Sequence, residues 1–360
     1  MAEPFKNLLN AAVVRDMLTR LKRAWSGFDA KHFERLTAGL DDLELKARAM
    51  HIASALEATL PPDFARAADI VQGAIEGGLT GWALWPVGEY LARRGQEAPE
   101  RALAVLHTLT RGFTAEWAIR PFIVRHPDLT FATLARWVHD PSEHVRRLVS
   151  EGSRPRLPWG MQLKSLIADP SPTLPLLEAL MDDDSEYVRK SVANHLNDIA
   201  KDHPHLVAQW LEKHLPDASR ERHSLLRHAS RSLIKGGDAR VLAAFGQGGR
   251  FRGDVRFVVT PPRIKLGESI TLDLSLQPSG KKSQALVIDY AIHHVKASGG
   301  TSPKVFKGWT FELPASKGRE LRKSHAVKLI TTRRYFSGAH RIELLINGRV
   351  EAEASFELLC

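Results

Sequence analysis

Three carboxylates and one tryptophan carry the chemistry that this sequence could perform. Glu151 stands where a predicted helix ends, in the stretch EGSRPRLPWG, and Trp159 belongs to the same stretch. Asp198 lies in VANHLNDIAKDHP and Glu116 lies in TAEWAIRPF. A carboxylate in a dry site stabilises positive charge that develops in a transition state, and an aromatic face attracts cations. These residue types suit the cleavage of a bond that leaves positively charged groups.

Each carboxylate also has an ordinary structural interpretation. Glu151 could be a helix-end glutamate that pairs with Arg147 or Arg154. Glu116 could pair with Arg120, four residues on. Such an ion pair would contribute roughly a few tenths of a kcal/mol to stability. Both interpretations stay open from the sequence alone.

Asp198 and Trp159 have alternatives of the same kind. Asn194, His195 and Asp198 share one helix face, which could be a polar surface in water. His195 and Asp198 have a spacing that suits a metal, but no third and fourth ligand follows at a convincing spacing, so we expect no metal site. Trp159 could fill the gap between helical repeats, a common fate of tryptophan.

Two prolines fix the backbone around the basic residues of the opening stretch. Pro155 and Pro158 exclude a regular helix or a central strand there. A rigid loop would let Arg154 and Arg156 reach phosphate groups at little cost in conformational entropy. The sequence therefore predicts that both arginines contact a polyanion.

Residues 1–245 read as helices, and part of the pattern repeats. DPSEHVRRLVS (140–150) and DDSEYVRKSVA (183–193) match at a separation of 43 residues, and LLRHASRSLIK (225–235) is a weaker copy. Repeats of this type stack into a solenoid with one concave face. Asp140 is the expected N-cap of its helix, with Pro141 in the first turn.

The repeated basic pairs predict a row of cations along the solenoid. These pairs are Arg146 with Arg147, and Arg189 with Lys190. We expect one member of each pair to pack inward and the other, Arg147 or Lys190, to face phosphates.

After a glycine-rich linker at 246–254, the pattern changes to alternation. About seven short strands, within 255–280 and at 284–297, 304–313, 325–332, 340–348 and 350–358, predict an immunoglobulin-like β-sandwich over 255–360. Asn347-Gly348 predicts a hairpin turn. The fold class is therefore mainly α, a HEAT-like repeat α-solenoid followed by an all-β immunoglobulin-like sandwich.

The predicted sandwich carries most of the net charge of +10. Residues 250–360 contain 19 Lys and Arg against 10 Asp and Glu, whereas the rest of the chain is nearly balanced. Such a basic module suits a polyanion. The expected contact loops are GKKS (280–283), SKGRELRKS (316–324) and TTRRYFSG (331–338), with Lys281, Lys282, Arg333 and Arg334 as the binding side chains.

Cysteine content and hydrophobic patterning exclude further classes of protein. The single cysteine, Cys360, excludes a disulfide framework within one chain. The first residues lack a signal-peptide pattern, and no apolar run approaches the length of about 18 residues that a membrane span needs. We expect a cytoplasmic monomer.

Several segments together resemble the AlkC family of bacterial DNA alkylation repair glycosylases. They are MAEPFKNLLN, LKARAMHIASALEATLPPDF, FTAEWAIRPFI, RRLVSEGSRPRLPW and VRKSVANHLNDIAKDHP, spread through most of residues 1–245. Some members also carry a C-terminal immunoglobulin-like domain, which fits the predicted sandwich. The resemblance implies a concave face that grips alkylated double-stranded DNA, and a protein that associates with the bacterial nucleoid when bound.

The resemblance also implies the reaction and its residues. It implies excision of cationic 3-methyladenine and 3-methylcytosine by cleavage of the N-glycosidic bond, without a deep pocket and without a cofactor. It places Glu151, Asp198 and Glu116 at the damaged nucleotide with Trp159 beside it. The rival hypothesis is a non-catalytic helical-repeat scaffold for DNA or protein, which predicts carboxylates that are far apart or consumed in ion pairs.

Overall fold

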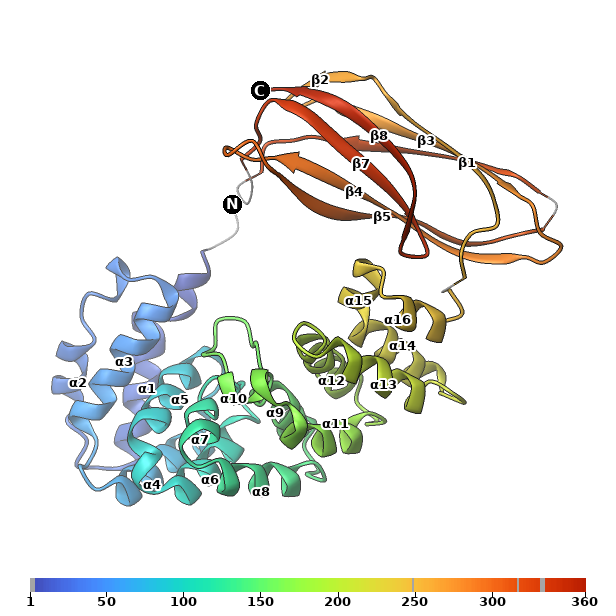
Figure 1. The fold of residues 1–360 in the computed structure, drawn as a ribbon. Helices are drawn as coiled ribbons and strands as arrows, with labels where there is room; N and C mark the ends of the chain where they lie inside the picture. Colours follow the sequence, from blue (N-terminus) through green and yellow to red (C-terminus); the bar gives the residue numbers. More distant parts are fainter. Residues whose placement is uncertain (1–3, 248, 316, 331–333) are drawn as a thin grey trace. The chain divides into compact units, whose positions relative to one another are not determined.

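A computed structural model describes residues 4–247, 249–315, 317–330 and 334–360 (Figure 1). The chain forms two compact units, Met1–Asp202 and His203–Cys360. Within the described residues no helix is both long enough and apolar enough to pass through a membrane.

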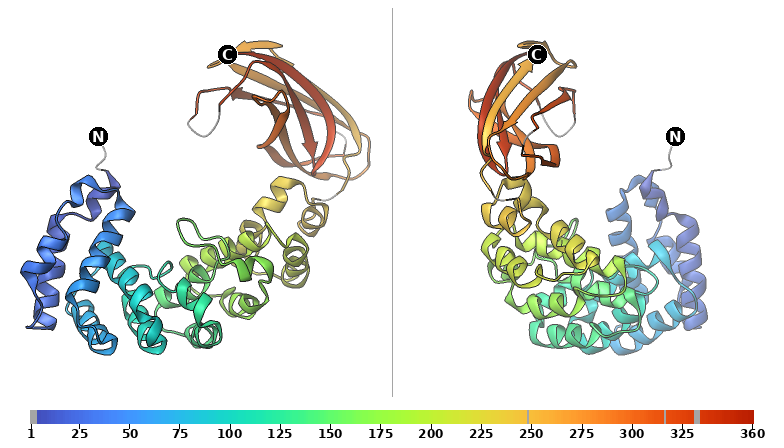
Figure 2. Two further views of the ribbon diagram at one scale, coloured as in Figure 1. Left: turned by 60° about the vertical axis from the view of Figure 1, so that its left-hand side comes forward. Right: turned by 90° about the vertical axis from the view of Figure 1, so that its right-hand side faces the viewer.

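The first unit is all-helical. Its helices are α1 (Ala11–Ala24), α2 (Ala30–Leu36), α3 (Leu45–Thr59), α4 (Phe64–Glu76), α5 (Leu84–Arg94), α6 (Pro99–Leu109), α7 (Arg120–Arg125), α8 (Pro127–Trp137), α9 (Glu143–Gly152), α10 (Lys164–Ala168), α11 (Leu174–Leu180) and α12 (Glu186–Ile199). Helices that are not consecutive in the sequence pack on one another, as α1 with α4, α3 with α5, and α9 with α12. Figure 2 shows these helices stacked in succession, and the predicted helical-repeat fold is confirmed.

The ends of these helices follow from local side-chain chemistry. The Asn10 side chain accepts hydrogen bonds from the first-turn backbone of α1, and the Asp63 side chain does so for α4. Pro61 and Pro62 follow the end of α3 at Thr59, as predicted.

The predicted cap at Asp140 is wrong by two residues. Helix α9 begins at Glu143 with Ser142 as its N-cap residue, and the Asp140 side chain accepts the Ser142 backbone N–H at 2.8 Å. An aspartate that bonds the backbone two residues on forms a turn, and here the turn precedes the helix. Asp183 makes the same bond to Ser185 before α12.

Both aspartates also receive a basic side chain from an earlier helix. His107 of α6 contacts Asp140 through Nε2 at 2.6 Å, and Arg146 of α9 contacts Asp183 through Nε at 2.6 Å. Each of these contacts ties a turn to a helix of the preceding repeat. The repeated sequence therefore encodes a repeated joint.

The second unit combines four helices with the strands. Its helices are α13 (Pro204–His214), α14 (Arg220–Ala229), α15 (Arg231–Gly236) and α16 (Ala239–Ala244). Its strands are β1 (Gly253–Thr260), β2 (Arg263–Lys265), β3 (Ser269–Pro278), β4 (Gln284–Val295), β5 (Thr301–Leu313), β6 (Arg319–Ala326), β7 (Gly338–Ile346) and β8 (Arg349–Leu359). The division between the units falls inside the predicted 1–245 domain, so the domain boundary stays a prediction.

Two sheets enclose the core of the β-domain. One has the order β1-β3-β6, and the other has the order β2-β8-β7-β4-β5. Pairing is antiparallel except between β2 and β8. Buried side chains of both sheets meet between them, for example Leu272 with Tyr290 and Leu276 with Leu344. The predicted immunoglobulin-like domain is confirmed.

Two local predictions in this domain had opposite outcomes. Asn347 and Gly348 join β7 to β8 with φ of +49° and +76°, as a tight hairpin turn requires. The segment 316–324, however, was predicted as a loop, yet β6 spans Arg319–Ala326. Its cations have cross-strand partners, since Arg322 pairs with Asp273 at 2.5 Å. Charges on an edge strand gave it the appearance of a loop.

Candidate active site

The three predicted carboxylates converge from separate segments of the first unit. Glu151 lies in the last turn of α9, Asp198 lies near the end of α12, and Glu116 lies in the turn before α7. Helices α9 and α12 pack directly on each other, which brings Glu151 and Asp198 together. All three side chains are buried. A buried carboxylate needs a cation or several hydrogen bonds, and each of them has both.

Arg154 is the centre of this arrangement. Its Nη1 donates to Glu151 Oε1 at 2.6 Å, and its Nε and Nη2 lie 2.8 Å from Asp198 Oδ2. Burial alone would lower the pKa of Arg154, but the two carboxylates outweigh it and raise that pKa. The guanidinium therefore stays charged and fixes both acids.

The remaining oxygens of this pair have their own donors. Ser191 of α12 donates its hydroxyl to Glu151 Oε2 at 2.6 Å. Lys201 donates to Asp198 Oδ1 at 2.7 Å, and the Lys201 side chain is 46% exposed. Asp198 is thus held on its buried side by Arg154 and on its solvent side by the partly exposed Lys201.

Glu116 joins the network through Arg147. The Arg147 Nη1 donates to Glu116 Oε2 at 2.9 Å, and its Nη2 lies 3.7 Å from Glu151 Oε1. The Thr114 hydroxyl also donates to Glu116 Oε2, at 2.7 Å. The Arg147 guanidinium lies over the ring of Tyr187, 4.7 Å from its centroid. The exposed Tyr187 marks the solvent edge of the site.

The ordinary alternatives for the glutamates had different outcomes. Glu151 does pair with Arg154 and approaches Arg147. The alternative Glu116–Arg120 pair is wrong, because Glu116 precedes α7 rather than sharing a helix with Arg120, and its partner is Arg147.

Trp159 stands out from the fold instead of filling it. Its side chain is 66% exposed, so it does not fill a gap between repeats. Its φ is +63°, a left-handed conformation that bulky residues rarely adopt. Strain of this kind persists only where the surroundings impose it, and it concentrates at functional sites. The geometry therefore favours a contact role for Trp159.

Arg120 was missed as a site residue. It has no exposed surface, and its guanidinium donates to the carbonyls of Gly152, Arg154 and Met161 at 2.7–2.8 Å. Burial lowers the pKa of Arg120 to about 10, and the neighbouring Arg154 contributes to the shift. The sequence signal was weak, because these partners are backbone atoms of a loop far along the chain.

Several predicted DNA-binding residues lie elsewhere than expected. Arg154 is buried between two carboxylates, so it is placed to hold acids rather than phosphates. His195 has no exposed surface, and its Nδ1 lies 2.9 Å from the Ser150 carbonyl oxygen. Burial lowers the pKa of His195 to about 3, so the imidazole is neutral at physiological pH. Neither residue reaches the surface, because α12 packs its inner face on α9.

The other predicted contacts in the first unit are at least partly exposed. Arg156 pairs with Asp202 at 2.8 Å, and Lys190 pairs with Glu186 at 2.8 Å. Asn194 is half-buried on α12. In the first repeat Arg146 and Arg147 both bind carboxylates. In the second repeat Arg189 donates to backbone carbonyls and the exposed Lys190 pairs with Glu186, so phosphate contacts of Arg147 and Lys190 stay a prediction.

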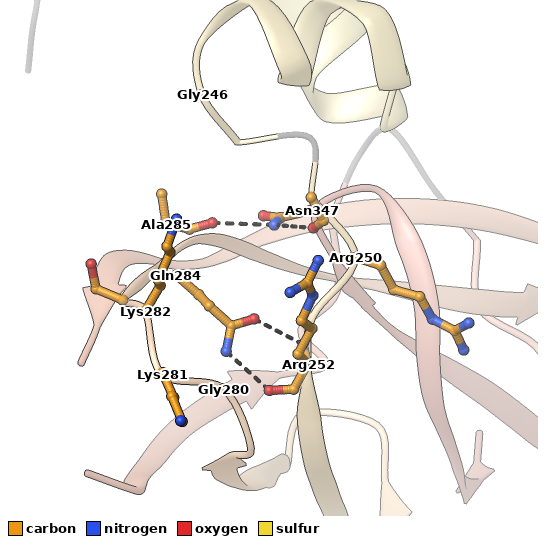
Figure 3. A pocket seen from close by; sticks show the side chains of 11 residues that line it. Gly246, Arg250, Arg252, Gly280, Lys281, Lys282, Gln284, Ala285 and Asn347 are labelled. Atoms are coloured by element: carbon orange, nitrogen blue, oxygen red, sulfur yellow. Dashed lines mark hydrogen bonds between the residues drawn. The ribbon is translucent and has the colours of Figure 1, made fainter. Parts of the chain in front are cut away.

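In the β-domain, Lys281 and Lys282 line a cleft of about 560 Å³ together with Arg250 and Arg252 (Figure 3). None of the described residues that line this cleft is acidic. Hydrogen bonds hold the base of the cleft in place. Gln284 exchanges two of them with the Arg252 backbone, at 2.8 and 3.0 Å. The loop and the arginine-bearing segment are therefore fixed beside each other.

Asn347 completes the base of this cleft. Its side chain donates to the carbonyls of Gly249 and Ala285 and accepts the Val287 N–H. Of the predicted cations after residue 330, Arg334 is exposed, with its guanidinium 5.5 Å from the Phe336 ring centroid. Arg333 lies outside the described residues.

Over the part of the chain that is described, no three His, Cys, Asp or Glu side chains gather so as to hold a metal ion. The carboxylate cluster instead uses arginine and lysine as its cations. The cluster can therefore place rigidly held negative charge beside an exposed aromatic ring.

Comparisons with known proteins place these features in a family. A family model described as "DNA alkylation repair enzyme" matches residues 112–233, which include all three carboxylates. A second model, described as "Uncharacterised protein YhaZ, C-terminal Ig-like domain", matches residues 254–360. The chain is 36% identical over 363 residues to "Uncharacterized protein YhaZ" of Bacillus subtilis (strain 168), covering 98% of this chain and 99% of that protein.

A solved structure is similar over the same extent. It is Pseudomonas fluorescens alkylpurine DNA glycosylase AlkC bound to DNA containing an abasic site analog. The match has a TM-score of 0.91 and 36% sequence identity, and it covers 99% of this chain and 100% of that chain.

Proposed function

Because this chain belongs to the AlkC family of DNA alkylation repair enzymes, we propose that it is a DNA glycosylase acting on cationic N3-methylated bases. The expected substrates are 3-methyladenine and 3-methylcytosine in alkylated duplex DNA. The observation that carries the proposal is the convergence of Glu116, Glu151 and Asp198 in one buried network. Arg154, which binds two of these acids, lies on the loop that presents Trp159.

The reaction needs little from the protein beyond charge and position. A methylated base that is already cationic is a good leaving group, and the sugar becomes oxocarbenium-like as the glycosidic bond breaks. Fixed carboxylates stabilise that charge most effectively where water is excluded. Burial of Glu151 and Asp198 supplies this environment, and Arg154 and Ser191 supply the rigidity. The base takes the electron pair of the broken bond and leaves as a neutral molecule, and water adds to the sugar carbon with loss of one proton to solvent.

The network must still expose negative charge to a cationic substrate. In the free protein every carboxylate has a basic partner, as the scaffold hypothesis predicts. The partners differ in exposure, since Arg154 is buried whereas Lys201 is nearly half exposed and holds Asp198 from the solvent side. A phosphate can therefore compete with Asp198 for Lys201. DNA binding would then unmask the acid that faces the lesion.

Trp159 would contact the damaged nucleotide without a deep base pocket. Its ring projects into solvent from a fixed backbone, where it can stack on a cationic base or on the sugar. Arg156, Lys190 and Lys201 would contact phosphates near it, and the basic cleft with Lys281 and Lys282 would contact the duplex through the β-domain. The protein would act as a monomer on alkylated duplex DNA.

The deciding experiment measures free 3-methyladenine and 3-methylcytosine released from methylated duplex DNA. We expect Glu151→Gln to lower the release rate by about 100-fold or more with DNA binding retained, because a preorganised electrostatic contact is worth roughly that much. Glu186→Gln is the matched control, since Glu186 lies exposed on α12. Failure of the unmutated protein to release either base, while it binds the DNA, would support the scaffold hypothesis instead.

A further inference from the structure

We propose that Arg120 is a positioning residue that holds the loop 153–163 from inside the fold, so that Trp159 keeps its exposed, left-handed conformation. The inference rests on the proposed function for what Trp159 does, but not for how Trp159 is held.

The Arg120 guanidinium grips the loop on both sides of Trp159. Its Nη1 donates to the carbonyls of Gly152 and Arg154, each at 2.8 Å, and its Nε donates to the carbonyl of Met161 at 2.7 Å. A planar guanidinium presents its donors in a rigid fork. One buried side chain therefore sets the separation of the two ends of the turn that carries Trp159.

A second brace reaches the loop next to the strained residue. The Trp117 indole Nε1 donates to the Pro158 carbonyl at 3.3 Å, and the Trp117 ring packs on Trp85 with centroids 4.8 Å apart. At Gly160 an added Cβ would lie 3.3 Å from both Arg120 Nε and Trp117 Cδ1. The loop thus lies directly against both braces, and a side chain at this position would be a tight fit.

The strain at Trp159 requires such braces. A bulky residue with φ of +63° reverts to an ordinary conformation unless its neighbours prevent it. The Trp159 ring is largely in solvent, so its own packing cannot impose the conformation. The backbone bonds to its neighbours remain as the source of the constraint, and Arg120 makes three of them.

The same contacts connect Trp159 to the carboxylates. The Arg154 carbonyl accepts from Arg120 while the Arg154 guanidinium holds Glu151 and Asp198. Loosening Arg120 would shift the aromatic ring relative to both acids. A displacement of about 1 Å in such a site can lower a rate about 100-fold.

The chain offers a matched control in Arg48. This arginine is equally buried, and it donates to the carbonyls of Leu43, Leu9 and Lys6 at 2.8–3.1 Å, far along the sequence from the loop. Arg48→Met and Arg120→Met each remove a buried cation that binds carbonyls. A general loss of stability would affect both variants, whereas a positioning role affects only Arg120.

The first test measures single-turnover base release with saturating protein, alongside thermal unfolding. We expect Arg120→Met to lower the rate about 100-fold, Arg120→Lys to recover part of it, and Arg48→Met to leave it unchanged among folded molecules. In a Trp159→Ala background, Arg120→Met should cause no further loss, because both changes remove the same placement. Losses that multiply in the double variant, or an unchanged rate in folded Arg120→Met, would overturn the proposal.

The second test does not depend on catalysis. Chymotrypsin cleaves after an accessible, mobile aromatic residue, and Trp159 is exposed but held. We expect Arg120→Met and the milder Trp117→Phe, which removes the indole N–H together with part of the ring, to speed cleavage at Trp159 about tenfold or more over Arg48→Met, since local opening governs such cleavage. Equal cleavage rates would refute the brace even if base release is observed. An unmutated protein that releases no base would refute the proposed function and leave the cleavage result standing.

Discussion

Glu151 and Asp198 bind one and the same guanidinium, that of Arg154, through contacts of 2.6 and 2.8 Å. Two acids that would repel each other are thereby kept close together in a buried site. The pairing explains how the cluster can exist without DNA. It also makes Arg154 the residue on which the stability of the site depends most.

Arg154→Met should lower the free energy of unfolding by about 3–5 kcal/mol, because it leaves two buried carboxylates without their central partner. Urea unfolding followed by helical circular dichroism measures the loss. Arg156→Met is the control from the same loop, and its partly exposed pair with Asp202 predicts a much smaller loss. Equal losses in the two variants would mean that the buried pairing contributes nothing special.

Substitutions at Trp159 should separate strain from function. Trp159→Ala removes an exposed ring, so we expect a stability change within about 0.5 kcal/mol. Trp159→Gly should be more stable than Trp159→Ala by about 1 kcal/mol, because only glycine adopts this φ freely. Both variants should lose base release, and thermal unfolding should reveal the difference in stability between them. A glycine variant less stable than the alanine variant would show that the backbone is not strained.

The stability of the helical unit should depend on pH through His195. Its folded pKa is about 3, below the ordinary value of about 6.5. As the pH falls below about 6.5, the unfolded chain binds a proton that the folded His195 does not, so the free energy of unfolding decreases by up to about 1.4 kcal/mol per pH unit. Above about pH 6.5 both forms are neutral and this contribution is fully present.

His195→Gln should show a shallower decline between pH 6.5 and 5, measured by urea unfolding at several pH values. His139→Gln, at an exposed histidine, should keep the slope of the unmutated protein. Parallel curves for all three proteins would exclude His195 as the source of the dependence. Release of base should not follow this titration, because His195 has no exposed surface.

The basic cleft of the β-domain predicts a salt-dependent contribution to DNA affinity. Lys281→Glu with Lys282→Glu should weaken binding at low salt and reduce the slope of log K against log salt by about 2, one for each lost phosphate contact. Lys31→Glu with Lys46→Glu, at exposed positions in the helical unit, is the control with the same charge change. An unchanged slope would mean that these lysines do not contact phosphate.

The sequence indicated the fold well because its signals were local and periodic. The 43-residue repeat and the Asn347-Gly348 turn can each be recognised without knowledge of the contacts that the folded chain makes. The start of α9 and the strand β6 were misjudged because aspartate turns precede helices and paired charges imitate loops. A local sequence pattern does not show which residue a charged side chain will pair with in the fold.

The site was only partly predictable for the same reason. The acids Glu116, Glu151 and Asp198 could be named, but their arginine partners are distant in the sequence. Arg154 was expected to contact phosphates, but its position in the fold places it against two carboxylates. Arg120 could not be found at all, since backbone carbonyls 32–41 residues away leave no pattern.

The two repeated joints of the helical unit differ in one respect that matters mechanically. The turn before α12 is fastened to α9 by a guanidinium, whereas the turn before α9 is fastened to α6 by an imidazole. Arg146 makes two hydrogen bonds with the Asp183 carboxylate, and His107 makes one with Asp140. Through these contacts, the turn before the helix that carries Asp198 is tied more firmly to the helix that carries Glu151 than the turn before α9 is tied to α6.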